Sequence, residues 1–129
     1  MNKIEAIQTK IDELEKEISL LRKKDKEKII QENQFLIGKC LSRGYTSMEK
    51  IIGITDVIFS NNNKACKIQL ECVYVFYDDR NDYKCTRIES NDYDEIDCES
   101  IKEYIDRYSV PLSTFNDFLN KAIKELMNL

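Results

Sequence analysis

The heptad repeat near the start of the chain constrains the fold more than any other feature of the sequence. Apolar residues recur there at spacings of three and four: Ile4, Ile7, Ile11, Leu14, Ile18 and Leu21. This is the a/d pattern of a coiled coil. Because no Gly or Pro occurs in residues 1–37, we expect one helix from about residue 2 to residue 33. Residues 1–33 are therefore predicted to form a helical, coiled-coil oligomerisation segment.

The residues that flank this repeat favour a parallel pair of helices. Ile occupies every a position and Leu most d positions, a combination typical of parallel two-stranded coils. In that arrangement Lys10 faces Glu15 of a second copy and Glu17 faces Arg22, so both pairs attract. We predict a homodimer through the N-terminal helix. The alternative is that this helix packs antiparallel on the C-terminal helix of the same chain.

After residue 33 the pattern changes to short runs rich in β-branched residues. Strands are expected at residues 35–41, 50–59, 66–77 and 83–88. One face of the third strand is strictly apolar, with Cys66, Ile68, Leu70, Cys72, Tyr74 and Phe76. The opposite face turns apolar at Val73, Val75 and Tyr77, where we expect a covering helix or a strongly curved sheet. The four strands would form an antiparallel meander or an SH3-like small barrel.

Two helices are expected after the strands. Residues 100–108 combine apolar residues at helical spacing with a capping box of Ser100 and Glu103, although the alternation from Tyr104 onward also fits a strand. Pro111 ends that element, and Ser113 or Thr114 begins an amphipathic helix that runs to about residue 128. The predicted fold class is α+β, with residues 34–129 as a small α+β domain.

The charge balance argues against several classes of partner. The net charge is -4, and residues 1–50 hold eleven Lys and Arg against nine Asp and Glu, so the remainder is the acidic part. Affinity for a phosphate backbone comes from clustered Lys and Arg, so we expect no direct binding to nucleic acid. No apolar stretch approaches the roughly 20 residues that span a bilayer, so we expect no membrane association.

The five cysteines indicate a reducing, cytoplasmic setting. They form an odd set without a CxxC pair, and the chain starts without a secretory signal. Reduced thiols are therefore expected rather than a disulfide framework, with Cys66 and Cys72 as core thiols. The cysteines also lack the close pairs of a structural zinc site.

Residues that usually carry catalysis are missing. The chain has no His, and its three glycines are isolated, so the commonest general base and a phosphate-binding loop are both absent from the sequence. Asp92, Asp94 and Glu103 have the spacing of a calcium loop, but Ile96 and Asp97 stand where an oxygen ligand and a Gly are needed. We predict that the protein is not an enzyme and holds no cofactor or metal.

The stretch "ESNDYDEIDCES", residues 89–100, is the most acidic part of the chain. Its simplest interpretation is a solvated connection after the fourth strand. The alternative is an anionic surface with tyrosines that binds a basic region of a protein partner. The predicted partner-binding residues are Asp78, Asp79, Asp82, Tyr83, Asp92, Tyr93, Asp94, Glu95 and Asp97.

The layout of the chain resembles small accessory proteins of phages and mobile elements of low-GC bacteria. The similarity lies in the succession "NQFLIGKCL", "KIIGITDVIF", "KIQLECVYVF" and "PLSTFNDFLNKAIKEL" after a heptad helix. It implies a non-enzymatic interaction protein that inhibits a host protein, including defence proteins such as CRISPR nucleases.

Two other functions stay open at this point. A small-molecule binding protein would sequester a nucleotide-like ligand with the basic side chains of Arg80, Lys84 and Arg87. A structural coiled-coil adaptor would form higher oligomers without a separate partner.

Overall fold

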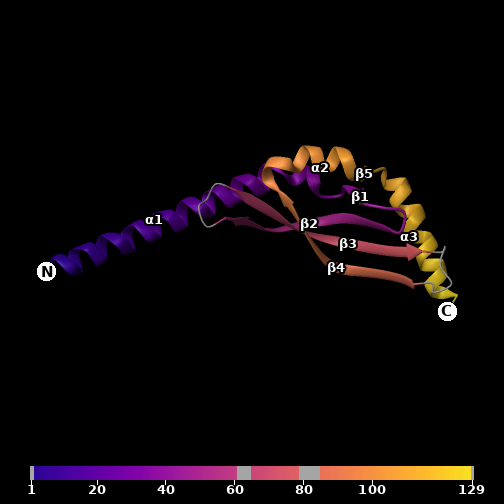
Figure 1. Ribbon diagram of the computed structural model, residues 1–129, viewed down its shortest axis with the longest axis horizontal. Coiled ribbons are helices and arrows are strands. Elements are labelled where there is room, and N and C mark those ends of the chain that lie inside the picture. Colours follow the sequence, from indigo (N-terminus) through magenta and orange to yellow (C-terminus); the bar gives the residue numbers. More distant parts are fainter. Residues whose placement is uncertain (1, 61–64, 79–84, 129) are drawn as a thin grey trace. The chain divides into compact units, whose positions relative to one another are not determined.

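The computed structural model describes residues 2–60, 65–78 and 85–128, the side chains of residues 85, 91 and 92 aside. It is an α+β fold with a long N-terminal helix, an antiparallel sheet and a C-terminal helix (Figure 1). The elements in order are α1 (Lys3–Glu32), η1 (Gln34–Leu36), β1 (Cys40–Ser42), β2 (Ser47–Phe59), β3 (Cys66–Asp78), β4 (Cys85–Asp97), η2 (Cys98–Ser100), α2 (Ile101–Tyr108), β5 (Ser109–Val110) and α3 (Leu112–Met127).

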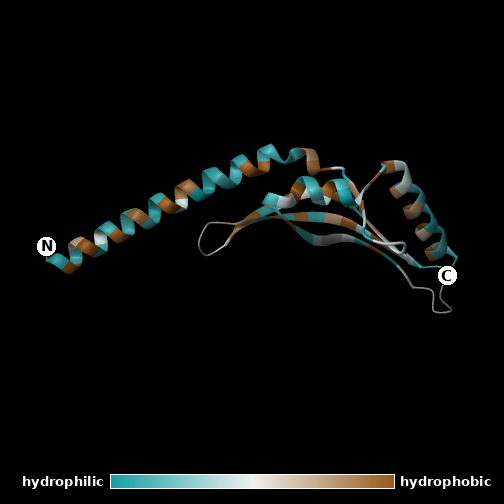
Figure 2. Cartoon of the chain, turned by 45° about the horizontal axis from the view of Figure 1, so that its top comes forward, coloured by the Kyte–Doolittle hydropathy of each residue, from teal (hydrophilic) through white to brown (hydrophobic). Residues whose placement is uncertain are grey.

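The chain divides into two compact units, Met1–Asn33 and Gln34–Leu129. The first unit consists of α1, and its predicted extent is confirmed. The Asn2 side chain caps the helix by accepting a hydrogen bond of 2.8 Å from the Glu5 backbone N–H. Apolar positions recur along α1 (Figure 2), except in the charged residues 22–28, and none of the helix residues is buried.

The second unit is built on an open antiparallel sheet with the strand order β4-β3-β2-β1-β5 among the described residues. Of the two predicted alternatives, the antiparallel meander is confirmed and the SH3-like barrel is wrong, because the sheet ends at β4 on one side and at β5 on the other. The strand expected at residues 35–41 forms only at its end: Phe35 and Leu36 belong to η1, and pairing with β2 is limited to Cys40–Ser42. Gly38 makes this transition with a φ of 94°, and its N–H donates to the Ile51 carbonyl at 2.7 Å.

The two faces of the sheet are named here from β3, whose alternation is confirmed. Face A carries Ile68, Leu70 and Cys72, which are fully buried. Face B carries Val73, Val75 and Tyr77, which pack in the cluster around Phe115 and Ala122 of α3. The predicted covering of this end of face B by a helix is thereby confirmed.

The two short helices of this unit cover opposite faces. Ile101 and Ile105 of α2 are buried, and Tyr104 hydrogen-bonds to Asp94, which pairs with Leu70 on face A. The helix expected at residues 100–108 is confirmed, but Ser100 makes no side-chain cap. The apolar stripe of α3 is used on face B, and this helix begins at Leu112 after Pro111 rather than at a Ser or Thr cap.

Candidate functional site

The acidic stretch is a strand rather than a solvated connection. Residues Glu89–Asp97 belong to β4, which pairs with β3 in the register Glu71↔Tyr93, Leu70↔Asp94 and Gln69↔Glu95. The predicted loop is therefore wrong. Because side chains alternate between faces along a strand, neighbouring acidic residues of β4 lie on opposite sides of the sheet and have different surroundings.

Tyr93, Glu95 and Asp97 lie on face B and are exposed. The Tyr93 side chain is 62% exposed, a high value for a large aromatic residue in a strand. The Glu95 Oε2 atom lies 3.9 Å from Lys67 Nζ, and both side chains are about half exposed, so solvent weakens this ion pair. Three of the predicted partner-binding residues are thus brought together on one open surface.

Asp94 lies on face A, where it joins a polar cluster of Arg43, Glu49, Asp94 and Tyr104. The Arg43 Nη2 atom donates to Glu49 Oε1 at 3.1 Å and also to Asp94 Oδ2. The Tyr104 hydroxyl donates to the same Asp94 oxygen at 3.3 Å. The Arg43 guanidinium carbon lies 5.2 Å from the centre of the Tyr104 ring, a cation–π distance. The polar cluster therefore connects the β1–β2 connection, β4 and α2.

Burial and charge act in opposite directions on this polar cluster. Burial alone would raise the pKa of Asp94, but the hydrogen bonds from Glu49 and Arg43, the Arg43 charge and the Glu95 backbone N–H lower it overall. Burial alone would lower the pKa of Arg43. The pKa is nevertheless raised overall, by the hydrogen bond to Asp94 and by the negative charges of Asp94 and Glu49. Two carboxyl groups thus share one guanidinium, and Glu49 is only 6% exposed.

The chemistry of the polar cluster suits a structural link between elements. Each hydrogen bond in it joins groups of the protein, and its cation is shared between two acids. No local pattern in the sequence identifies Arg43 and Glu49 as members of this cluster, because 51 residues separate Arg43 from Asp94. No group of three His, Cys, Asp or Glu side chains suited to a metal ion occurs among the described residues.

The other predicted site residues are spread over the second unit. Asp78 ends β3 and is half-buried. Arg87 of the alternative ligand site is exposed, with its guanidinium carbon 5.7 Å from the centre of the Phe76 ring and Nη1 3.6 Å from Glu89 Oε1. The backbone of Asp92 pairs with Cys72, but its side chain lies outside the description. The remaining predicted residues lie outside the described ranges: Asp79, Arg80, Asp82, Tyr83 and Lys84.

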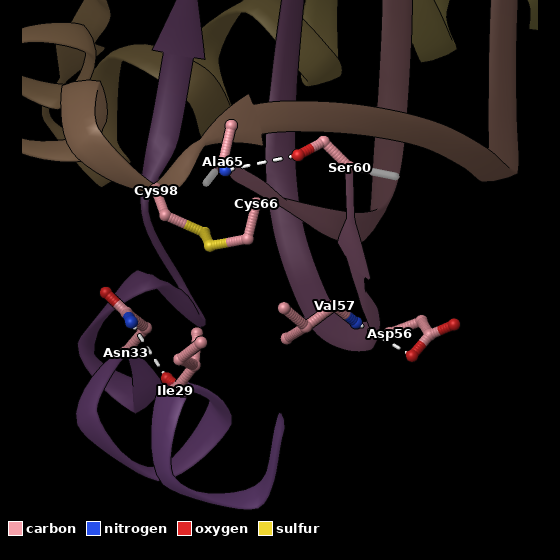
Figure 3. The surroundings of a disulfide bond; sticks show 8 residues. All are labelled: Ile29, Asn33, Asp56, Val57, Ser60, Ala65, Cys66 and Cys98. Carbon is pink, nitrogen blue, oxygen red and sulfur yellow. Dashed lines mark hydrogen bonds between the residues drawn. A yellow bond between two sulfur atoms is a disulfide. The ribbon is translucent and has the colours of Figure 1, made fainter. Parts of the chain in front are cut away.

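The cysteines depart from the prediction of reduced thiols. Cys66 and Cys98 form a disulfide, with their Cα atoms 5.6 Å apart (Figure 3). Lys67 and Asp97 form the last pair at this end of the β3–β4 ladder. Cys66 and Cys98 are the next residues beyond that pair, so they lie opposite each other although 32 residues separate them in the chain. The prediction of a core thiol is wrong for Cys66 and confirmed for Cys72, which is buried and takes no part in the disulfide.

Cys40, in β1, is also a buried thiol outside the disulfide. Burial raises its pKa, and nearby Lys50 opposes this shift only in part. The thiol therefore stays protonated and poorly nucleophilic at neutral pH. It belongs to the core beneath α3 with Val75 and Phe115.

Comparisons with known proteins add no assignment: no protein-family model matches the chain, and no curated protein or solved structure is significantly similar to it. None of the described helices is long and apolar enough to cross a membrane.

Proposed function

We propose that this chain is a non-enzymatic interaction protein, which dimerises through α1 and binds a protein partner with its sheet unit. The observation that carries the proposal is the exposed heptad repeat. Its six a and d side chains are between 42% and 79% exposed, although all of them are Ile or Leu. Helices in proteins draw most of their stability from packing of an apolar face, so a 30-residue helix without a buried residue is expected to pair.

The charges beside the repeat favour a second copy of α1 as the occupant. A parallel pair brings Lys10 of each chain next to Glu15 of the other, and Glu17 next to Arg22. Each exposed pair contributes only about 0.2–1 kcal/mol. These charges therefore select the orientation and register, while the buried Ile and Leu side chains supply the affinity.

The sheet unit supplies the proposed partner surface. Tyr93, Glu95 and Asp97 are exposed together on face B of β4. Tyr offers rigid contact area with a polar end, and carboxylates steer association with a basic partner. In line with the resemblance to phage accessory proteins, we propose a protein of the host cell as this partner.

The dimer is tested by placing charge in the repeat. In the variant Ile11→Asp/Ile18→Asp, four apolar side chains per dimer are lost, at about 1.5 kcal/mol each. The dimer constant should therefore fall by roughly 10⁴-fold, and native mass spectrometry should change from dimer to monomer. Leu20→Asp is the matched control, because Leu20 lies on the same helix outside the a and d positions and is 62% exposed.

Two results would contradict the dimer. One is a wild-type protein that is already monomeric at micromolar concentration. The other is an Ile11→Asp/Ile18→Asp variant that keeps the wild-type mass. A mass increment of a small molecule on the purified wild-type protein would instead favour the ligand-sequestering alternative.

The orientation of the helices is tested by exchanging charges. Lys10→Glu alone should weaken a parallel dimer, because the introduced carboxylate would meet the Glu15 carboxylate of the second copy. The double variant Lys10→Glu/Glu15→Lys restores opposite charges in a parallel pair and should recover the wild-type dimer constant. If the double variant is no better than Lys10→Glu, the parallel arrangement is wrong.

A further inference from the structure

The outer edge of β4 is the longest open strand edge in the described part of the chain. β4 has 13 residues and is the last strand of the sheet, with β3 on its inner side only (Figure 1). On the opposite side, β5 has two residues, and β1 pairs with only three residues of β2, so the rest of β2 forms the border there. An edge strand presents a row of backbone N–H and C=O groups that can pair with another strand. A register shift interrupts the row between Glu89 and Asp92, and the stretch Asp92–Asp97 beyond it is long enough for an added strand of ordinary length.

The side chains along this edge differ between the two faces. On face A, Ile96 is buried and Asp94 belongs to the polar cluster beneath α2. On face B, Tyr93, Glu95 and Asp97 are exposed at alternate positions. A strand that pairs with β4 would place every second side chain beside these three residues.

These charges argue against a second copy of β4 as the added strand. β4 has no Lys, and its one basic residue, Arg87, already lies 3.6 Å from Glu89. Pairing two copies would bring acidic side chains together across the new ladder, and like charges that face each other are destabilising. Acidic residues on an edge strand are a known protection against such self-pairing.

The same charges complement a basic strand. Lys or Arg at alternate positions would lie next to Glu95 and Asp97, and an Arg can also stack on the exposed ring of Tyr93. The backbone supplies affinity that does not depend on sequence, while the alternating side chains supply selectivity for positive charge. Both contributions act on the same segment of the partner.

We infer that the outer edge of β4 accepts an extended, basic segment of a protein partner as an additional strand of the sheet. The inference rests on the proposed function, since it names the chemistry of the partner that the sheet unit binds. It also identifies the backbone of β4, in addition to its carboxylates, as part of the binding surface.

The test uses the full-length protein and three synthetic peptides of about ten residues, the length of an ordinary long strand. One alternates Arg and Val, one alternates Glu and Val, and one alternates Arg and Pro. The third peptide keeps the charge but loses half of its backbone donors. Affinity is measured by fluorescence anisotropy at low and high salt, and amide hydrogen exchange locates the binding site.

The Arg–Val peptide should bind and slow exchange of β4 amides by at least about tenfold, and its affinity should fall with salt. The Arg–Pro peptide should bind at least about tenfold more weakly, because it cannot complete the ladder. The Glu–Val peptide should not bind. Equal binding of the two Arg peptides, or protection confined to residues outside β4, would overturn the inference.

Charge reversal provides the matched variants. Glu95→Lys/Asp97→Lys should lose the Arg–Val peptide and gain the Glu–Val peptide. Glu103→Lys/Asp117→Lys makes the same change of net charge on exposed positions of α2 and α3, and should bind as the wild type does. If both double variants lose the Arg–Val peptide equally, only general electrostatic attraction is present and the inference fails.

The result of the peptide experiments is independent of the result of the dimer experiments. A protein whose dimer proposal fails would be monomeric and would still bind the Arg–Val peptide. A protein whose edge proposal fails would remain a dimer through α1 and would ignore the peptide.

Discussion

Replacing Arg43 with Met tests the polar cluster, because it removes the guanidinium that two carboxyl groups share. The Glu49 side chain is 8% exposed and that of Asp94 is 17% exposed, whereas Arg43 is 44% exposed. In the variant both acids keep their positions beneath α2 without their cation. The apolar Met side chain retains much of the volume and the packing of the Arg stem.

The expected cost is about 2 kcal/mol of unfolding free energy at neutral pH. Removing one partner from a fully buried ion pair costs about 3–5 kcal/mol. Solvent around Arg43 screens part of its interaction, so the cost must be smaller than that range. Loss of the contact between Arg43 and the Tyr104 ring adds about 0.5–1 kcal/mol at a partly exposed site.

The cost should depend on pH in a definite direction. The pKa of Asp94 in the folded protein lies below its ordinary value of 3.8. A lowered pKa stabilises the fold at pH values above 3.8, and this contribution is lost as the pH falls through the folded-state pKa. In Arg43→Met the burial of Asp94 favours its protonated form, and protonation at low pH removes the cost of burying its charge. The difference between wild type and variant should therefore shrink from neutral pH to about pH 3.5.

The measurement is urea unfolding followed by tyrosine fluorescence. All seven tyrosines lie between residues 45 and 108 and the chain has no Trp, so the signal reports the second unit alone. Arg107→Met is the control, because this exposed Arg lies over the Tyr108 ring, 5.4 Å from its centre, and is not a member of the polar cluster. Adding Glu49→Gln to Arg43→Met should recover part of the loss. A loss below about 0.5 kcal/mol, or one that stays constant with pH, would refute this account of the polar cluster.

Two further predictions concern the second unit. Cys66→Ser should lower the unfolding free energy by about 3–4 kcal/mol, because the disulfide closes a loop of 32 residues in the unfolded chain. Reduction of the wild-type protein with dithiothreitol should give the same loss of stability. A smaller loss in both experiments would contradict this prediction. Gly38→Ala should lower the unfolding free energy by about 1–2 kcal/mol, because an L residue is strained at a φ of 94°. Gly44→Ala is the control: a Cβ has no atom within 4 Å at either position, so Gly44→Ala should change stability little. Equal losses of stability in the two urea titrations would show that the backbone conformation is not the cause.

The helices and β3 could be predicted from the sequence because each has a local pattern. The heptad spacing of α1, the short apolar repeat of α2 and the strict alternation of β3 each repeat within a few residues. The strand expected at residues 50–59 is confirmed as β2, but the face on which each of its residues lies follows no local pattern. Its residues Ile51, Ile54 and Val57 pair with Cys72, Leu70 and Ile68, and this spacing of three is possible only because the ladder shifts twice.

The acidic half of β4 could not be predicted in the same way. Asp and Asn are unfavourable in strands, so a stretch rich in both indicates a turn when it is considered alone. Its pairing with β3 overrides that preference, because Ile96 is buried opposite Ile68 and Asp94 finds Arg43. These partners come from distant parts of the chain, and no local pattern in the sequence identifies them.

The register between β3 and β4 determines both the polar cluster and the exposed acidic surface. A slip of one residue would move Glu95 beneath α2 and expose Ile96, so both would be lost together. Two features fix the register of β4 at the two ends of its acidic part, Asp92–Asp97. The ladder shifts between the pairs of Cys72 and Tyr74, and the Cys66–Cys98 disulfide continues the ladder at the other end. The disulfide therefore contributes to selecting which acids of β4 face solvent, in addition to its effect on the unfolded chain.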